Sequence, residues 1–215
     1  MKCLIVPTVF AMSKKEFYSR FNKLRPLAKF IQIDFMDGKL VKKKSIKIKD
    51  IPNLSPYKNN FEAHLMIKNP EKQINKLKEK GFSKVIFHIE ALKNRNKTIK
   101  LIAEINKSKM KSFIALNPKT NINKVFFYLP YINGILLMGH KPGLENISFL
   151  PSIYKKIKSL RLINNSISIQ IDGGVNDKNI KKLVKSGANI FNVGSFVADA
   201  DNPIKNLARL NSIVG

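Results

Sequence analysis

The stretch Ile31-Gln32-Ile33-Asp34-Phe35-Met36-Asp37-Gly38 combines the pattern of a buried strand with two closely spaced acidic residues. Its alternating, β-branched residues predict a strand. The strand ends in Asp34 and Asp37, so both carboxylates lie where the chain leaves the core. Carboxylates gathered there are costly to remove from water unless they bind a metal ion, pair with cations or transfer protons. A plain Asp-Gly turn after a strand would also explain Asp37-Gly38.

The order of strand, polar tip and helix recurs along the chain. Amphipathic helical patterns separate short β-rich runs, and this alternation predicts a parallel sheet. Eight such units in 215 residues favour a closed (β/α)8 TIM barrel. A doubly wound open sheet would show the same alternation. No linker or change of composition divides the chain, so residues 1–215 are predicted to form one domain. The predicted strands begin near Cys3, Phe30, Phe61, Val85, Ser112, Gly134, Ser168 and Asn189.

Capping patterns predict where the helices begin. Ser13 and Glu16 have the spacing of a capping box, opening a helix that Pro26 ends. An Asn before a Pro is an N-cap followed by the favoured first helical residue. The other predicted starts are Asn69-Pro70, Asn176 or Asp177, and Asn202-Pro203.

The charge balance bears on the class of partner. The chain carries 40 Lys and Arg against 14 Asp and Glu, a formal net charge of +26. A nucleic-acid partner would fit this charge. However, only five of the cations are arginine, whose forked guanidinium suits bases and phosphates best. The lysines are also spread over nearly every segment. We therefore do not expect a dedicated nucleic-acid partner, although a general positive field would draw a phosphorylated metabolite toward the protein.

Cysteine usage and hydropathy indicate the compartment. Cys3 is the only cysteine, which excludes a disulfide within the chain and favours a reducing cytoplasm. Cys3 itself is expected to pack as a small core residue. No apolar run approaches the ~18 residues of a membrane span, and no signal-peptide pattern opens the chain. The sequence therefore predicts a cytoplasmic protein without a membrane segment.

In a TIM barrel the functional residues lie at the C-terminal ends of the strands. All three histidines of the chain fall at such predicted ends, although a single one would more often be a core residue. The last two strand ends are rich in glycine and each precedes a helix, which is typical of phosphate-binding loops. In chain order the predicted tips are Thr8, Asp34, Met36, Asp37, His64, Met66, His88, Glu90, Asn117, Met138, His140, Asp172-Gly173-Gly174 and Gly194-Ser195.

These tips resemble the motifs of the ribulose-phosphate 3-epimerase family. The resemblance follows the family's order and covers essentially the whole chain. The matching stretches are Ile33-Asp34-Phe35-Met36-Asp37-Gly38, Ala63-His64-Leu65-Met66-Ile67-Lys68-Asn69-Pro70, Phe87-His88-Ile89-Glu90-Ala91, Ala115-Leu116-Asn117-Pro118-Lys119-Thr120, Leu137-Met138 with Pro142-Gly143, Ile171-Asp172-Gly173-Gly174-Val175 and Val193-Gly194-Ser195.

The resemblance implies a TIM barrel of the ribulose-phosphate-binding type. It also implies an isomerase of the pentose phosphate pathway that interconverts D-ribulose 5-phosphate and D-xylulose 5-phosphate through an enediolate. Family members hold one divalent metal ion and form dimers and larger assemblies, so a homo-oligomer is expected. The residues carried over are Asp34 and Asp172 as acid, base and metal ligands; His64 as metal ligand and substrate contact; Thr8, Met36, Met66, Met138 and Gly143 for the substrate; and Gly173, Gly174, Gly194 and Ser195 for phosphate. Asp37 is expected to shape its loop.

The chain departs from the family at three places. After the second strand, Lys42-Lys43 replaces the family's usual Pro-Asn, so the geometry of that loop is not carried over. Gln32 stands where the family has a second metal-binding histidine, and an amide oxygen is a weaker ligand than imidazole. We therefore expect a weakened metal site holding Zn²⁺, Mn²⁺, Fe²⁺ or Mg²⁺, with Gln32 as its least secure ligand and His140 as a conceivable replacement. The loop after the sixth strand reads Lys141-Pro142-Gly143-Leu144-Glu145-Asn146-Ile147 and lacks two family glycines, so a lid there would be less mobile or differently shaped.

Because the departures fall at the metal site and the lid, two other functions stay open. One is an epimerase of another ketose phosphate, such as allulose 6-phosphate. The other is a non-catalytic barrel that binds a phosphorylated ligand or nucleic acid.

Overall fold

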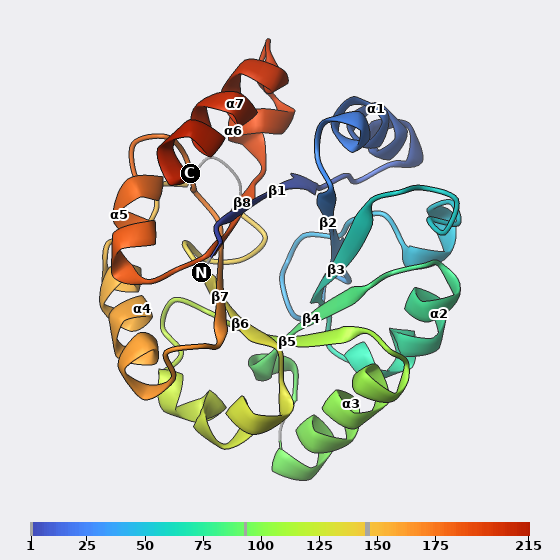
Figure 1. Cartoon of the computed structure of the whole chain (residues 1–215). Helices are drawn as coiled ribbons and strands as arrows, with labels where there is room; N and C mark the ends of the chain where they lie inside the picture. Colours follow the sequence, from blue (N-terminus) through green and yellow to red (C-terminus); the bar gives the residue numbers. More distant parts are fainter. Residues whose placement is uncertain (1, 93, 145–146) are drawn as a thin grey trace.

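The computed structural model describes residues 2–92, 94–144 and 147–215, and it forms a closed barrel of eight parallel strands in sequence order (Figure 1). The structure therefore confirms the predicted barrel and excludes the alternative, a doubly wound open sheet. Each strand begins at or within one residue of its predicted start. The strands are β1 Leu4–Val9, β2 Phe30–Met36, β3 Asn60–Met66, β4 Lys84–His88, β5 Lys111–Leu116, β6 Gly134–Met138, β7 Ser168–Asp172 and β8 Ile190–Val193.

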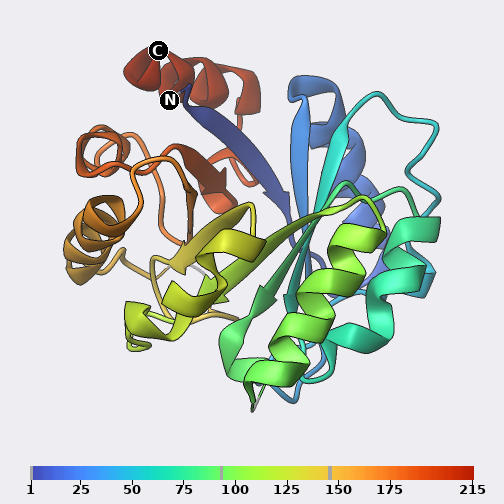
Figure 2. The same cartoon turned by 60° about the horizontal axis from the view of Figure 1, so that its bottom comes forward.

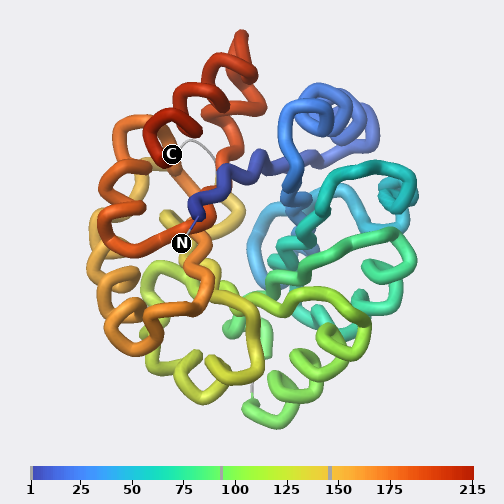
Figure 3. Tube along the Cα trace, viewed as in Figure 1, coloured from blue at the N-terminus to red at the C-terminus, as the bar shows by residue number. Residues whose placement is uncertain are grey.

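Helices surround the strands on the outside, as the side view also shows (Figure 2). The chain begins at β1 and ends after α7 on the same side of the molecule, at the N-terminal mouth of the barrel (Figure 3). The α-helices are α1 Lys14–Leu24, α2 Ile74–Glu79, α3 Arg95–Lys107, α4 Ser152–Ile163, α5 Ile180–Ser186, α6 Ser195–Ala198 and α7 Pro203–Val214. The 3-10 segments are η1 Arg25–Leu27, η2 Ile48–Asp50, η3 Pro70–Gln73, η4 Ile89–Ala91 and η5 Ile122–Tyr131.

Two of the predicted caps are confirmed by their hydrogen bonds. The Ser13 hydroxyl accepts from the Glu16 backbone N–H at the start of α1, at 3.2 Å. The Asn202 side chain accepts from the Lys205 N–H at the start of α7, at 2.9 Å. In both cases a side-chain oxygen satisfies a backbone donor that has no partner within the helix.

At Asn69-Pro70 the predicted start is confirmed in position, since η3 begins at Pro70, but its helix type and cap differ, and the predicted start at Asn176 or Asp177 is wrong. Asn69 makes no side-chain capping bond, because the segment after it begins as the 3-10 turn η3 and becomes α-helical only at Ile74. The α5 helix begins at Ile180, later than Asn176 or Asp177, because residues before it form a turn. In that turn the Asn179 amide donates to the Gly174 carbonyl oxygen at 2.8 Å. Both differences arise from loop geometry that capping patterns do not encode.

The main core lies between the strands and the helices. The α1 residues Phe17 and Phe21 stack at 5.2 Å between ring centroids, and Phe21 packs on Phe61 of β3. Cys3 is half-buried and packs against this core, as expected. Inside the barrel a smaller apolar cluster is formed by Val6, Ile86, Phe113, Ala115, Leu136, Met138 and Ile190. Among the described residues, no helix combines the length and apolar character that a membrane crossing requires.

The barrel interior also contains a layer of buried polar side chains, which we call the polar layer: Gln32, Glu62, Lys84, Gln170 and Asn192. Interiors of such barrels are usually filled by Val, Ile and Leu. Lys84 Nζ lies 2.5 Å from Glu62 Oε1, and the Glu62 side chain is only 1% exposed. The polar layer connects the N-terminal part of the barrel to the functional mouth.

Candidate functional site

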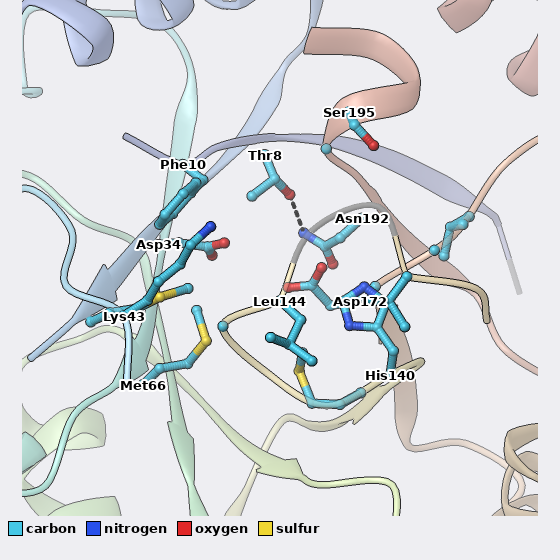
Figure 4. A pocket seen from close by; sticks show the side chains of 18 of the residues that line it. Thr8, Phe10, Asp34, Lys43, Met66, His140, Leu144, Asp172, Asn192 and Ser195 are labelled. Atoms are coloured by element: carbon cyan, nitrogen blue, oxygen red, sulfur yellow. Dashed lines mark hydrogen bonds between the residues drawn. The ribbon is translucent and has the colours of Figure 1, made fainter. Parts of the chain in front are cut away.

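The C-terminal ends of the strands meet at one mouth, and the register of the sheet aligns the predicted site residues. Asp34 of β2 pairs with His64 of β3, and Met36 pairs with Met66. Asp172 lies at the end of β7 beside Met138 of β6. Figure 4 shows Asp34 and Asp172 on facing sides of the pocket that occupies this mouth.

The centre of the site is a cluster of Asp34, His64, Asp172 and Gln32. His64 Nδ1 lies 3.2 Å from Asp34 Oδ1 and 3.1 Å from Asp172 Oδ2. Gln32 Nε2 donates to the same two oxygens, at 2.9 and 2.7 Å. Since all four side chains are buried, these contacts hold two carboxylates together in a region with little water. A buried carboxylate pair is stable only with donors or cations of this kind.

The two carboxyl groups differ in their pKa directions. Burial raises the pKa of Asp34, and the nearby Asp172 charge adds to this, outweighing the hydrogen bonds from His64 and Gln32. Burial also acts to raise the pKa of Asp172, but the hydrogen bond and charge of His64 and the bond from Gln32 lower it overall. The two environments therefore shift the pKa values of Asp34 and Asp172 in opposite directions, the pattern that separates a general acid from a general base.

His64 belongs to a chain of buried polar groups that runs away from the pocket. Burial lowers the pKa of this imidazole, but hydrogen bonds to Asp172 and Asp34 raise it to about 9. Its other nitrogen, Nε2, lies 2.9 Å from His88 Nε2. His88 Nδ1 is in turn 3.3 Å from Glu90 Oε2, and Glu90 accepts hydrogen bonds from the Asn117 N–H and the Thr120 hydroxyl. His88 and Glu90 thus orient His64 from behind and do not line the pocket.

The pocket walls contain nearly all of the predicted substrate residues. Met36, Met66 and Met138 are buried and line the pocket, while Phe10 and Val41 pack against the first two. The predicted lining residues found there are Thr8, Asp34, Met36, Met66, Met138, Gly143, Asp172, Gly173, Gly174, Gly194 and Ser195. Gln32 and His64 lie beneath this surface.

The glycine-rich loops after β7 and β8 both line the pocket, through Gly173 and Gly174 and through Gly194 and Ser195. Gly173 and Gly174 have φ angles of 102° and 71°, a region that side chains disfavour. A Cβ atom on Gly173 would lie 2.9 Å from His140 Nε2. At Gly194 a Cβ would meet no atom within 4 Å, so the backbone there borders open space. These loops expose backbone to the pocket as an anion site requires.

The loop after β6 also borders the pocket through Gly143, Leu144 and Ile147. Leu144 and Ile147 are 46% and 44% exposed, so the loop brings apolar side chains to the rim. Glu145 and Asn146, which contribute to the predicted change in the lid, lie outside the described residues. His140, the conceivable replacement ligand, lines the pocket, and its Nδ1 lies 3.0 Å from the Lys141 carbonyl oxygen.

Asp37 does not join the carboxylate cluster. Its Oδ1 accepts from the backbone N–H groups of Lys39 and Leu40, and its Oδ2 accepts from that of Lys68. Burial acts to raise the Asp37 pKa, but these hydrogen bonds lower it overall. The expectation that Asp37 shapes its loop agrees with these contacts.

Several pocket residues were missed from the sequence. Phe10, Arg20, Lys43, Asn192 and Asp199 also line the pocket. Arg20 projects from α1, where it donates to the Phe10 carbonyl oxygen at 2.7 Å and pairs with Asp199 at 3.1 Å. The sequence offered one indication of Arg20, namely that arginine is rare among the cationic residues of this chain. Lys43 lies in a run of three lysines, where no single one stands out.

Three of the four expected ligands satisfy the spacing of a metal site. Asp34, His64 and Asp172 each offer a ligand atom, and these atoms lie within 4.8 Å of one another. Three buried ligands with further positions left for substrate are typical of a catalytic metal ion. Gln32 turns its amide nitrogen, and not its oxygen, toward this group. Its role as a ligand stays a prediction.

Solved structures confirm the fold. The chain superposes over its full length on a 3-hexulose-6-phosphate synthase from Salmonella typhimurium, with a TM-score of 0.76, 12% identity and 98% of that chain covered. An orotidine 5'-phosphate decarboxylase from Pyrococcus horikoshii gives a TM-score of 0.66 at 15% identity, covering 98% of this chain and 99% of that one.

Sequence comparison identifies the family. A ribulose-phosphate 3-epimerase of Aquifex aeolicus is 30% identical over 196 residues, which cover 89% of this chain and 87% of the relative. The Mycobacterium tuberculosis protein of the same name is 29% identical over 193 residues, covering 87% and 83%. The profile of the Ribulose-phosphate 3 epimerase family matches residues 4–198, from β1 through α6. The chain therefore belongs to the ribulose-phosphate 3-epimerase family of isomerases.

Proposed function

We propose that this protein interconverts D-ribulose 5-phosphate and D-xylulose 5-phosphate by proton transfer at C3. The observation that carries the proposal is the buried pair of carboxylates, Asp34 and Asp172, joined through His64 beneath the pocket. Membership of the family and the names of the relatives support the same reaction.

The chemistry requires two groups on opposite faces of the reacting carbon. Inversion beside a carbonyl needs one base to remove the α-proton and one acid to return a proton on the other face. Asp34 and Asp172 come from β2 and β7, which are not neighbours in the barrel. Their pKa values are shifted in opposite directions, raised for Asp34 and lowered for Asp172, which suits one group to the role of acid and the other to that of base.

Asp34, His64 and Asp172 are the residues that would hold a divalent metal ion. When bound, such an ion stabilises the negative oxygens of an enediolate. Two carboxylates and a single imidazole form a harder ligand set than a histidine-rich one, which favours Mn²⁺, Fe²⁺ or Mg²⁺ over tight Zn²⁺.

The remaining pocket residues position the substrate and exclude water. Met36, Met66 and Met138 form an apolar, polarisable wall against the reacting carbons. The backbone around Gly173, Gly174, Gly194 and Ser195 binds the phosphate group, and Thr8 contacts the sugar through its hydroxyl. The positive net charge draws the anionic substrate toward the protein.

The direct test of the reaction is NMR of ribulose 5-phosphate incubated with the purified protein in D₂O. We expect deuterium at C3 and conversion to xylulose 5-phosphate. The same assay with allulose 6-phosphate separates the two epimerase activities, because the preferred substrate turns over at the higher kcat/KM. A protein that gains thermal stability from ribulose 5-phosphate without exchanging its C3 proton would be a binding protein, contrary to the proposal.

Metal binding is expected to release protons, because the imidazole must be neutral to act as a ligand. His64 has a pKa of about 9, so it is mostly protonated at pH 7. The apparent affinity for Mn²⁺ should therefore rise by up to about tenfold per pH unit as pH increases toward that pKa. Calorimetry in buffers of different ionisation enthalpy measures the protons released. An affinity that does not change between pH 6 and pH 8 would show that His64 is not a ligand.

A further inference from the structure

We infer that Gln32 is not a metal ligand but a hydrogen-bond donor that bridges Asp34 and Asp172, and that the polar layer beneath it fixes this orientation. The inference rests on the proposed role of the two carboxylates. It assigns Gln32 as a positioning residue, which holds the acid and the base at a set separation.

The first support is the set of groups around the amide nitrogen of Gln32. Gln32 Nε2 lies 2.9 Å from Asp34 Oδ1 and 2.7 Å from Asp172 Oδ2. An amide nitrogen carries two hydrogens, one for each carboxylate. Ionised Asp172 can only accept, so an amide oxygen in this place would have no donor from that residue. Gln32 itself is completely buried, so water does not supply alternative partners.

The second support comes from the groups around the amide oxygen of Gln32 and does not depend on Asp34 or Asp172. Lys84 can only donate, and its Nζ lies 3.3 Å from Gln170 Oε1. Ionised Glu62 can only accept, and its Oε2 lies 2.9 Å from Gln170 Nε2. These two charged residues fix which end of Gln170 is oxygen and which is nitrogen. The Gln170 nitrogen consequently faces Gln32.

The orientation of Gln170 then sets that of Gln32. The two hydrogens of Gln170 Nε2 go to Asn192 Oδ1 at 2.6 Å and Glu62 Oε2 at 2.9 Å, and Gln32 Oε1 faces the same nitrogen as a longer contact at 3.4 Å. Reversing the Gln32 amide to offer its oxygen to a metal ion would place two NH₂ groups against each other. Both would be buried, and the hydrogens of Gln32 would lose their acceptors. The polar layer thus opposes coordination by Gln32.

Two consequences distinguish a bridge from a ligand. First, the carboxylates are held together by Gln32 and His64 without a metal ion, so removing Gln32 should destabilise the metal-free protein. Second, the protein supplies only three ligands to the metal. Removing the Gln32 amide should therefore leave the metal affinity unchanged or increase it, because the oxygens that it engages become free.

The test compares the wild type with Gln32→Met, which keeps the side-chain length and removes both the donor and the oxygen. Gln73→Met, at a half-buried position outside the cluster, is the matched control. Mn²⁺ and Co²⁺ affinities are measured by chelator competition, the visible spectrum of bound Co²⁺ reports its ligand set, and Tm is measured in EDTA. We expect Gln32→Met to bind both ions at least as tightly as the wild type, with the same Co²⁺ spectrum. Its Tm in EDTA should fall below those of the wild type and Gln73→Met.

A tenfold loss of affinity or a changed Co²⁺ spectrum in Gln32→Met would overturn the inference, as would an unchanged Tm in EDTA. If this variant does not fold, NMR of the wild type decides. A bridge predicts slowly exchanging Gln32 side-chain hydrogens in EDTA and an unshifted side-chain carbonyl carbon on Zn²⁺ addition, whereas a ligand predicts a shifted carbon. None of these measurements uses substrate, so absence of ribulose 5-phosphate turnover would refute the proposed function and leave this result intact.

Discussion

Replacing Asp172 or Asp34 with Asn is expected to lower kcat for epimerisation by about 10²–10⁴-fold, the usual contribution of a positioned acid or base. Asn keeps the shape of the side chain but cannot exchange a proton. Both residues are buried and share His64 as a partner. Epimerisation needs both groups in each turnover, so each single substitution should be sufficient to cause this decrease.

Isotope exchange separates the roles of the two residues. Each variant keeps one base, so it should still exchange the C3 proton of one epimer in D₂O without inverting it. The two variants should keep exchange on opposite epimers. Asp201→Asn, at an exposed position in the turn before α7, is the matched control and should behave like the wild type. Equal, undiminished epimerisation in all three variants would eliminate the two-carboxylate mechanism.

Removing the cation of the polar layer is expected to cause the largest loss of stability. Lys84→Met leaves Glu62, only 1% exposed, as a buried charge without its ion-pair partner. Breaking such a pair costs about 3–5 kcal/mol. For a chain of this size the Tm should fall by about 6–20 °C. Thermal or urea unfolding measures the change, and Lys111→Met at the exposed start of β5 is the control.

The double variant Glu62→Gln with Lys84→Met tests whether the unpaired Glu62 charge causes the loss of stability. It removes both charges and keeps a carbonyl oxygen that can accept from Gln170. Most of the lost free energy of unfolding should return, because the cost arises from the unpaired carboxylate and not from the missing lysine. If the double variant is as unstable as Lys84→Met, packing of the lysine chain over Phe113, where Nζ lies 4.3 Å from the ring centroid, is the larger contribution.

The fold could be predicted from sequence because its information is local and repeated. Strands such as β2, Phe30–Met36, carry their own apolar pattern, and parallel pairing brings all their ends to one mouth. The group of Asp34, His64 and Asp172 followed from that geometry together with the family motifs. The start of α5 was misplaced because Asp and Asn also favour turns, and Asp177 lies in the turn before this helix.

The orientation of Gln32 could not be predicted, because it depends on charges brought from other strands. Gln170 comes from β7, Glu62 from β3 and Lys84 from β4, and none is near Gln32 in the sequence. A sequence pattern identifies an amide at this position but does not indicate which of its ends faces the carboxylates. Arg20 was missed for a related reason, since its place at the pocket depends on how α1 packs beside the mouth.

The polar layer has a consequence for attempts to make the protein more heat-resistant. Aliphatic repacking of Glu62, Lys84 and Gln170 would resemble a normal barrel interior and could raise the melting temperature when all three change together. The same repacking would free the amide of Gln32 to rotate. A selection for thermostability alone would therefore accept changes at Glu62, Lys84 and Gln170, although they loosen the contacts that hold the acid–base pair. Activity must be screened in parallel.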